Sequence, residues 1–193
     1  MQAIYWGSEA KCPELVEGQS LILFLNMTTL EIKKYPDPIL KQKCQEVEDI
    51  DNEVLKLISE MKKIVTEADG AGLAAPQVGV PRRMIVIQTE DGPQAFINPK
   101  IISKSKEVET MEEGCLSFPG IRLNIKRAKG VLIEALDTDG KVIQVEAKNI
   151  QARIFQHEID HLDGILFIDR LGFLQRLKMK LPTVANSGVS SLP

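Results

Sequence analysis

One short stretch, QHEIDHLDG at residues 156–164, constrains this chain more than any other. It contains both histidines of the 193 residues, His157 and His161, and Glu158 follows the first of them. Histidines four positions apart lie on one face of an α-helix, so their imidazoles can bind the same metal ion. A carboxylate beside them is placed to act as a general base toward a bound water. We predict a helix over residues 149–163 that carries part of a metal site. An amphipathic helix with two incidental histidines is the alternative, and it is disfavoured because both histidines of the chain fall in this pattern.

The third metal ligand is not expected after this motif. Catalytic metal sites usually have three protein ligands and one open position. In the longer pattern H-E-x-x-H-x-x-G-x-x-H, the third histidine would fall on Phe167, and no glutamate follows Glu158. Asp163 and Asp169 lie close to the helix end, where capping, ion pairing or exposure to solvent is the better interpretation. The remaining ligand is therefore expected upstream.

A cysteine is the best upstream candidate, because a thiolate is a strong ligand for first-row divalent metals and no further histidine exists. Cys12 precedes the well-patterned part of the chain, and Cys44 lies in a charged stretch where an incidental small residue is the better interpretation. Cys115 lies in EGCLSFPG, where glycine and proline residues shape a loop that can present a side chain. A buried structural cysteine is the alternative at this position. We predict that Cys115 completes the metal site with His157 and His161.

Residue patterns predict two helices and at least four strands. Asp51 is expected to cap a helix that runs to about Ala68, with apolar residues at three- and four-residue spacing. The small residues of 69–81 predict a loop, and the charged residues 103–113 lead into the loop around Cys115. The predicted strands are residues 83–88 and 95–102, joined through a turn at 91–93, and residues 131–137 and 141–147, joined as a hairpin through 138–140.

These elements predict an α+β fold. Small antiparallel and mixed β-sheets are expected to pack around a central helix that carries the H-E-x-x-H motif and is covered on most of its faces. Leucines three apart at 171, 174 and 177 indicate a C-terminal helix. We divide the chain into an N-terminal extension over residues 1–26, a single catalytic domain over residues 27–180 and a disordered tail over residues 181–193.

Composition excludes several classes of protein. Hydrophobic residues make up 44% and charged residues 26% of the chain, as in ordinary globular domains. A net charge of -3 does not favour DNA or other nucleic-acid binding. No run approaches the roughly 20 apolar residues that span a membrane. Three scattered cysteines do not make a disulfide framework, so a reducing compartment is expected.

Three separated motifs carry a resemblance to a known family. GAGLAAPQVG at 70–79, EGCLSFPG at 113–120 and QHEIDHLDG at 156–164 have the order and spacing found in peptide deformylases of the bacterial type. The resemblance extends from about Met27 to Leu174 and includes YPDPIL near its start. It implies an enzyme that removes the formyl group from the N-terminal formylmethionine of newly made peptides and releases formate.

The resemblance also implies roles for individual residues. Glu158 takes a proton from the metal-activated water and later delivers it to the leaving amine. The side-chain amide of Gln77 and the backbone N–H of Leu116 stabilise the oxyanion. The cofactor is one divalent metal ion. Fe(II) is favoured, although the Cys-His-His set also suits Zn(II), Ni(II) or Co(II).

Substrate contacts follow from the same resemblance. The segments around Gly72 and Gly114 are expected to pair with the substrate backbone as an added strand. Ala71 stands where the family usually has a bulkier Ile or Val. Arg153 stands where an apolar residue is more usual, with a solvent-exposed helix position as the alternative interpretation. The residues expected to bind substrate are Gly70, Ala71, Gly72, Glu113, Gly114, Phe118, Ile150 and Ile154, with Leu116 and His157 nearby.

The expected partners are N-formylmethionyl nascent peptides in a bacterial cytoplasm. The segment from Arg170 carries four basic residues and no acidic residue, which is compatible with contact to the ribosome. Two other functions stay open at this point. One is a metallopeptidase that cleaves internal peptide bonds, and the other is a metal-binding homologue without catalytic activity.

Overall fold

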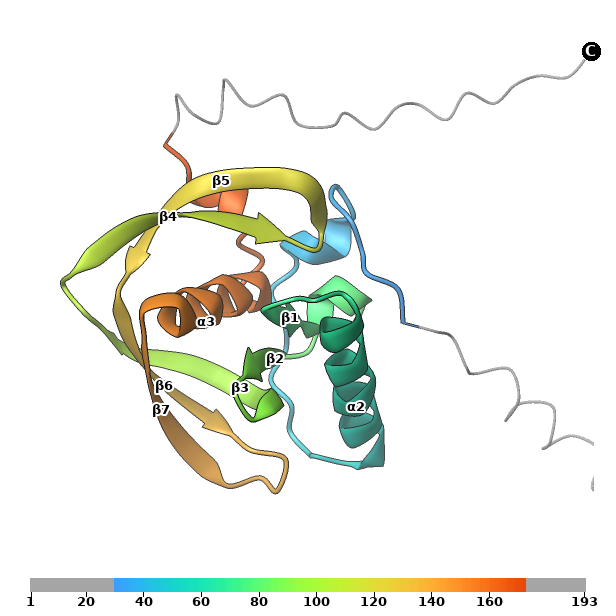
Figure 1. Cartoon of the computed structure of the whole chain (residues 1–193). Helices are drawn as coiled ribbons and strands as arrows, with labels where there is room; N and C mark the ends of the chain where they lie inside the picture. The colour runs from blue at the N-terminus through green and yellow to red at the C-terminus, as the bar shows by residue number, and fades with distance from the viewer. Residues whose placement is uncertain (1–29, 173–193) are drawn as a thin grey trace, which may run out of the picture.

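The structure, a computed structural model, describes residues 30–172. The predicted N-terminal extension (1–26), the predicted tail (181–193) and the predicted C-terminal helix beyond residue 172 lie outside the described residues. The described chain forms an α+β fold with two antiparallel sheets, two α-helices and three short 3-10 helices (Figure 1). Among these residues, no helix is long and apolar enough to cross a membrane.

The larger sheet has five strands in the order β1-β2-β3-β6-β7, and every neighbouring pair is antiparallel. The predicted strands at 83–88, 95–102, 131–137 and 141–147 are confirmed with small shifts at their ends. In β2 the side chains alternate between the two faces, so Ile85 and Ile87 join one core while Met84 and Val86 join another. The strands are β1 (Gly72–Ala74), β2 (Met84–Thr89), β3 (Gly92–Lys104), β6 (Gly130–Leu136) and β7 (Val142–Lys148).

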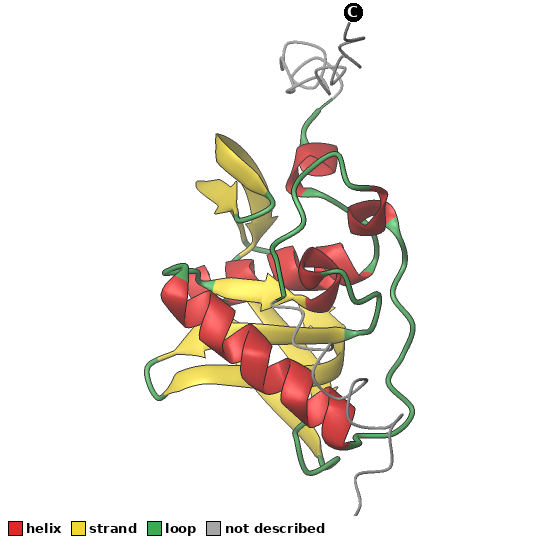
Figure 2. Ribbon diagram, turned by 90° about the vertical axis from the view of Figure 1, so that its right-hand side faces the viewer, coloured by secondary structure: helices red, strands yellow, loops and turns green. Residues whose placement is uncertain are grey.

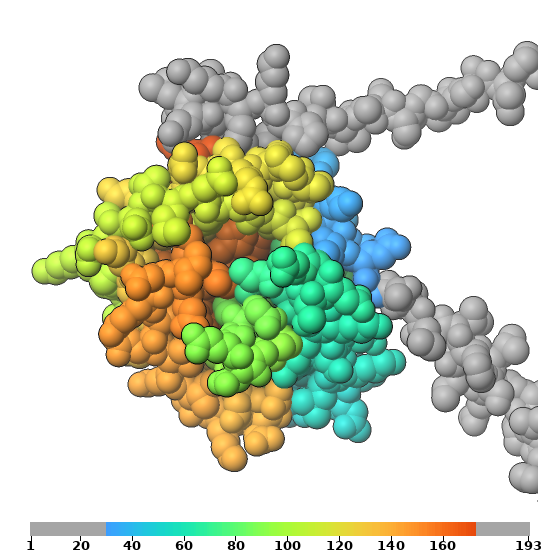
Figure 3. All heavy atoms as spheres, viewed as in Figure 1, coloured from blue at the N-terminus to red at the C-terminus, as the bar shows by residue number. Residues whose placement is uncertain are grey.

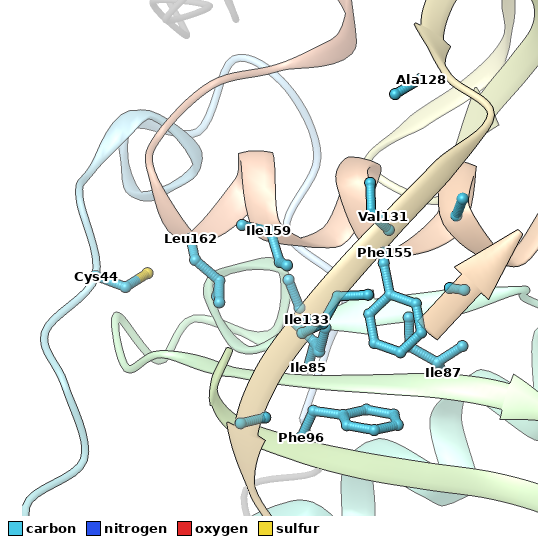
Figure 4. Close-up of a cluster of buried hydrophobic side chains, with 14 residues drawn as sticks. Cys44, Ile85, Ile87, Phe96, Ala128, Val131, Ile133, Phe155, Ile159 and Leu162 are labelled. Atoms are coloured by element: carbon cyan, nitrogen blue, oxygen red, sulfur yellow. The ribbon is translucent and has the colours of Figure 1, made fainter. Parts of the chain in front are cut away.

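Helix α3 (Asn149–Leu162) packs on one face of this sheet and is the central helix of the molecule (Figure 1). Figure 4 shows Phe155, Ile159 and Leu162 of α3 pointing toward side chains of β2, β3 and β6. The prediction that this helix is covered on most of its faces is confirmed, because ten of its fourteen residues are buried. Gly164, at a φ of +70°, follows the helix, and a Cβ there would overlap the carbonyl of Lys41.

Helix α2 (Asn52–Glu67) covers the opposite face of the sheet, and Figure 2 shows it lying across the strands. The Asp51 carboxylate accepts a hydrogen bond from the Val54 N–H at 2.8 Å, so the predicted N-cap is confirmed. The buried stripe of α2 packs against β1, β2 and β3 in a second core. The helix thereby supports the short strand β1, which lies within the GAGLAAPQVG motif.

A separate two-stranded hairpin, β4 (Val108–Cys115) and β5 (Phe118–Ala128), arches over the other side of α3 (Figure 1). The prediction missed this hairpin, because residues 103–113 were expected to be a charged stretch leading into a loop. Most of the β4 side chains face solvent, so the strand lacks the alternating apolar residues that identify other strands. The 3-10 helices η1 (Pro38–Lys41) and η3 (Phe167–Arg170) pack beneath the hairpin in a third core.

The expected loop at residues 69–81 is also partly wrong. It contains strand β1, which pairs with β2, and the 3-10 helix η2 (Ala75–Val78), which ends at Gly79 with a φ of +87°. Both elements are too short to produce a periodic pattern. Their effect is to hold the GAGLAAPQVG motif against α3 rather than leave it on the surface.

Candidate metal centre

The three predicted metal ligands meet at one point between α3 and the hairpin. Ligand atoms of Cys115, His157 and His161 all lie within 4.8 Å of one another. The Cys115 Sγ is 3.3 Å from the His161 Nε2. Cys115 is the last residue of β4, so a strand end rather than the predicted loop presents the thiol. The two imidazoles come from successive turns of α3, as their spacing predicts.

The donor set fits a divalent cation. Two ligands of a tetrahedral site with thiolate and imidazole bonds lie roughly 3.6 Å apart, given bond lengths of about 2.3 and 2.1 Å. The separations between the three side chains are compatible with that arrangement. Burial and the charges of His157 and Arg127 hold the pKa of His161 well below its ordinary value, so its imidazole is neutral and able to bind a metal.

Glu158 lies beside these ligands and points toward Gly72. A Cβ placed on Gly72 would lie only 2.7 Å from the Glu158 Oε1. Within the described residues, the Glu158 Oε2 is buried and has no hydrogen-bond partner. Burial raises the pKa of this carboxyl to about 7, although the charges of His157 and Arg127 lower it. A carboxylate with a free oxygen and a pKa in this range suits proton transfer near neutral pH.

The amide of Gln77 is oriented by the backbone of its own segment. The Ala74 N–H donates to the Gln77 Oε1 at 2.8 Å, which turns the Nε2 toward the metal ligands. That Nε2 lies 3.2 Å from the Ser117 Oγ and 3.5 Å from the Cys115 Sγ. Leu116 and Ser117 form the two-residue turn between Cys115 and Phe118, outside the ladder of the hairpin. These contacts bring the motif at residues 70–79 next to the motif at residues 113–120, beside the candidate metal ligands.

A cleft with a volume of about 580 Å³ opens over the site. Figure 3 shows the hollow between the yellow-green atoms of the hairpin and the teal atoms that precede β1, with orange atoms of α3 exposed within it. His161 does not line the cleft and is fully buried behind it. The other predicted site residues all line it: Gly70, Ala71, Gly72, Gln77, Glu113, Gly114, Cys115, Leu116, Phe118, Ile150, Ile154, His157 and Glu158.

Behind the metal ligands lies a buried network of charges that the sequence did not reveal. The His157 Nδ1 is 3.0 Å from the Glu113 Oε2, which leaves the Nε2 for the metal. Arg127 pairs with Glu113 at 2.6 Å and with Asp160 at 2.7 Å. Arg170 also pairs with Asp160. Burial by itself raises the pKa of Glu113, but hydrogen bonds from His157 and Arg127 lower it to about 2.

The structure corrects one interpretation of a site residue and shows where three other candidate residues lie. Arg153 is not at a solvent-exposed position, since it is 5% exposed and pairs with Glu113 at 2.6 Å. Cys44 is a buried core residue away from the ligands. Asp163 pairs with Arg83, and Asp169 pairs with Lys41, in line with the interpretation that neither binds the metal. No short-range pattern pairs these charges, because Asp160 lies inside the third motif whereas Arg127 lies twelve residues after Cys115.

Comparisons with known proteins agree with one another. The polypeptide deformylase family model matches residues 29–177. The peptide deformylase of Thermodesulfovibrio yellowstonii is 47% identical over 155 residues, which are 78% of this chain and 93% of that protein. The crystal structure of the Thermotoga maritima peptide deformylase is similar with a TM-score of 0.72 and 41% identity, over 74% of this chain and 97% of that one. The Met-Ala-Ser-bound structure of a class I type b peptide deformylase from Acinetobacter baumannii has a TM-score of 0.70 and 34% identity, over 74% of this chain and 98% of that one.

Proposed function

The chain belongs to the polypeptide deformylase family, and from this premise we propose how its own residues remove the N-formyl group from the N-terminal formylmethionine of newly synthesised peptides. The enzyme is a metal-dependent hydrolase that releases formate. The observation that carries the proposal is the convergence of Cys115, His157 and His161 beside the free oxygen of Glu158, at the inner end of a cleft.

Cys115, His157 and His161 would hold the metal ion. When bound, a divalent cation polarises the formyl carbonyl and lowers the pKa of a coordinated water. Glu113 holds the His157 ring through its Nδ1, so that the Nε2 faces the ligand atoms of the other two residues. The complete burial of His161 keeps solvent from one side of the site.

Glu158 moves the proton. Its carboxylate accepts a proton from the attacking water as the new C–O bond forms, and it gives that proton to the amine nitrogen as the C–N bond breaks. Proton transfer to and from a positioned side chain typically contributes a factor of about 10² to 10⁴ in rate. The second proton of the water stays on the formyl product as formic acid and then passes to the released amine. The products are therefore formate and a peptide whose N-terminal methionine carries a protonated amine, and atoms and charge balance without a further reactant.

Gln77 and Leu116 stabilise the oxyanion. The Nε2 of Gln77 and the backbone N–H of Leu116 donate to the former carbonyl oxygen as it becomes negatively charged. A neutral amide is suited to this role because it adds no positive charge beside a cation. Loss of one such donor typically costs about 10² to 10³ in kcat.

The rest of the cleft binds the peptide. Backbone groups at Gly70, Gly72 and Gly114 pair with the substrate backbone, with Ala71 and Glu113 beside them. The Met-Ala-Ser bound to the Acinetobacter relative supports a peptide as the ligand. The methionine side chain lies against apolar groups that line the cleft: Phe118, Ile150 and Ile154. Main-chain pairing explains how one enzyme could process many different nascent chains.

The experiment that tests the function is formate release from a formyl-Met tripeptide. The protein is purified without oxygen and its metal content is measured, with Glu158→Ala as the matched variant. We expect metal-dependent release that Glu158→Ala loses while it retains the metal. Release of new internal peptide ends instead of formate would support a metallopeptidase. No release by the metallated wild type would indicate a homologue that binds metal without catalysis.

Three finer points are part of the proposal. Fe(II) is the native ion, and iron content with loss of activity in air would support it, whereas zinc in anaerobically purified protein would contradict it.

The enzyme works in the cytoplasm. Its basic C-terminal segment contacts the ribosome, which co-sedimentation tests with a deletion from residue 173. That deletion keeps Arg170, which pairs with Asp160. Undiminished co-sedimentation of the shortened protein with ribosomes would contradict ribosome contact through this segment.

A further inference from the structure

Arg153 is a buried arginine that faces the hairpin from α3. Its Nη1 donates to the Glu113 Oε1 at 2.6 Å and to the Ile125 carbonyl at 2.8 Å. Its Nη2 donates to the Glu109 carbonyl at 2.8 Å. Glu109 and Glu113 belong to β4 and Ile125 to β5, so one guanidinium binds both strands of the hairpin.

The hairpin depends on such contacts because it is a separate sheet from the five-stranded one. Arg127 crosses the same boundary in the opposite direction, from β5 to Asp160 of α3. Gln156 of α3 adds a pair of hydrogen bonds to the backbone of Ala128, at 2.9 and 3.2 Å. Two of the metal ligands lie on α3 and the third lies at the end of β4, so these contacts span the metal site.

Glu113 has no spare acceptor capacity. Its Oε1 accepts from Arg127 and Arg153, and its Oε2 accepts from Arg127 and His157. A carboxylate offers about four acceptor sites. Each donor therefore helps to hold the Glu113 carboxylate in place, and this carboxylate in turn orients the His157 ring. Glu113 also lies only two residues before Cys115, so its position bears on both ligands.

We propose that Arg153 is a positioning residue that holds the β4 end of the hairpin against α3 and thereby sets the separation of Cys115 from the two histidines. It acts through Glu113 and through the backbone of both strands, and it touches no metal ligand in the contacts described above. The inference rests on the proposed metal centre. An apolar residue at position 153 would remove one hydrogen-bond donor to Glu113. It would also remove the donors to the backbone carbonyls of Ile125 and Glu109. A lysine has one nitrogen and lacks the planar geometry needed to reach acceptors on both strands.

The test measures metal binding without substrate. Wild type, Arg153→Met, Arg153→Lys and Arg83→Met are titrated with Zn²⁺ in competition with a chromophoric chelator, below the unfolding temperature of each protein. Arg83 is the matched control, because it is also a buried arginine, is 8% exposed, and pairs with Asp163 at the C-terminal end of α3 without contacting Glu113. The absorption of each protein with saturating Co²⁺ reports whether the thiolate is bound.

We expect Arg153→Met to weaken zinc affinity by about 10- to 100-fold, as for other residues that orient metal ligands. Arg153→Lys should lie between it and the wild type, and Arg83→Met should match the wild type. The thiolate-to-cobalt absorption band should be reduced in Arg153→Met and unchanged in Arg83→Met. Wild-type affinity and spectrum in Arg153→Met would overturn the proposal, and so would an equal loss in Arg83→Met.

The outcomes separate this proposal from the function. If Arg153→Met does not fold, Arg153→Lys decides: weaker zinc binding supports the positioning role and wild-type affinity overturns it. A wild type that binds zinc but releases no formate would contradict the function and leave the role of Arg153 standing. A wild type that binds no metal would overturn both.

Discussion

At the scale of single residues, the close approach of Gly72 to Glu158 explains why a glycine stands at this position. The Gly72 backbone passes within contact of the carboxyl group, and the nearest atoms to an added Cβ would be the Oε1 at 2.7 Å and the Cγ at 2.8 Å. The φ of Gly72 lies outside the left-handed region, so the side chain of Glu158, and not the backbone conformation, requires the glycine.

We therefore predict that Gly72→Ala displaces Glu158 and lowers kcat by about 100-fold, because a shift of about 1 Å in a catalytic group has an effect of that size. Zinc affinity should be unchanged, because the three atoms nearest to the added Cβ all belong to Glu158 and none belongs to Cys115, His157 or His161. Steady-state deformylation and zinc titration measure the two quantities. Gly130→Ala is the control, since its Cβ would meet nothing closer than 3.6 Å. Full activity in Gly72→Ala would show that the observed position of Glu158 is not the working one.

The pH dependence of the reaction follows from the same carboxyl group. Burial raises the pKa of Glu158 to about 7 in the metal-free protein, and a nearby cation lowers it again. Glu158 must be deprotonated to act as the base. Activity is therefore present above the pKa that Glu158 has with the cation bound, and it is lost as the pH falls through that pKa. We predict that kcat/KM falls tenfold per pH unit on an acid limb between about pH 5 and pH 7. A profile that stays flat through this range would contradict the assignment of Glu158 as the base.

At the scale of elements, periodicity and capping predicted both α-helices and the strands around them. Helix α2 has the Asp51 cap and its apolar stripe, and α3 has the metal motif, so short-range patterns were sufficient. Strand β4 could not be found in this way, because its charged residues are stabilised by partners far along the chain. Glu113 pairs with Arg127 and Arg153, which lie 14 and 40 residues away. The convergence of Cys115, His157 and His161 was predictable from the motifs, whereas the network of charges beside them depends on the tertiary fold.

The ion pairs between the hairpin and α3 predict an acid-sensitive contribution to stability. Hydrogen bonds to Glu113 outweigh its burial and lower its pKa from 4.5 to about 2. Because the folded pKa is the lower one, Glu113 stabilises the fold above pH 4.5, and this stabilisation is lost as the pH falls toward 2. At about 1.4 kcal/mol per pKa unit, the contribution is about 3 kcal/mol.

We predict that Glu113→Gln lowers the free energy of unfolding at pH 7 and reduces its decline under acid. Urea denaturation of the metal-free protein at neutral and acidic pH measures both effects. Glu112→Gln is the matched control on the same strand, because Glu112 is exposed and only pairs with Arg122 at 3.5 Å. The same acid sensitivity in Glu113→Gln as in the wild type would assign the loss of stability to other carboxyl groups.

At the scale of the whole molecule, three hydrophobic cores meet around one metal site. One core joins α3 to the large sheet, a second joins α2 to the opposite face, and a third joins the hairpin to η1 and η3. Cys115 is packed against the third core, while the histidines lie on α3. A bound metal therefore cross-links the hairpin to the helix that the first core holds, in addition to its role in the reaction.

This arrangement predicts that removal of the metal destabilises the whole fold. A ligand present at 1,000 times its dissociation constant stabilises the native state by about 4 kcal/mol. For a protein of this size, each kcal/mol raises the unfolding temperature by roughly 2–4 °C, so the metallated protein should unfold roughly 10 °C above the chelator-treated protein. Calorimetry of the two forms measures the difference. Cys115→Ser should lose most of it, whereas Cys44→Ser should lower both temperatures and keep the difference, because Cys44 is buried in the first core and is not one of the three residues whose ligand atoms meet. Equal unfolding temperatures with and without metal would contradict the idea that the cation cross-links the hairpin to α3. The contacts of Arg153, Arg127 and Gln156 would then hold the hairpin to α3 without the metal.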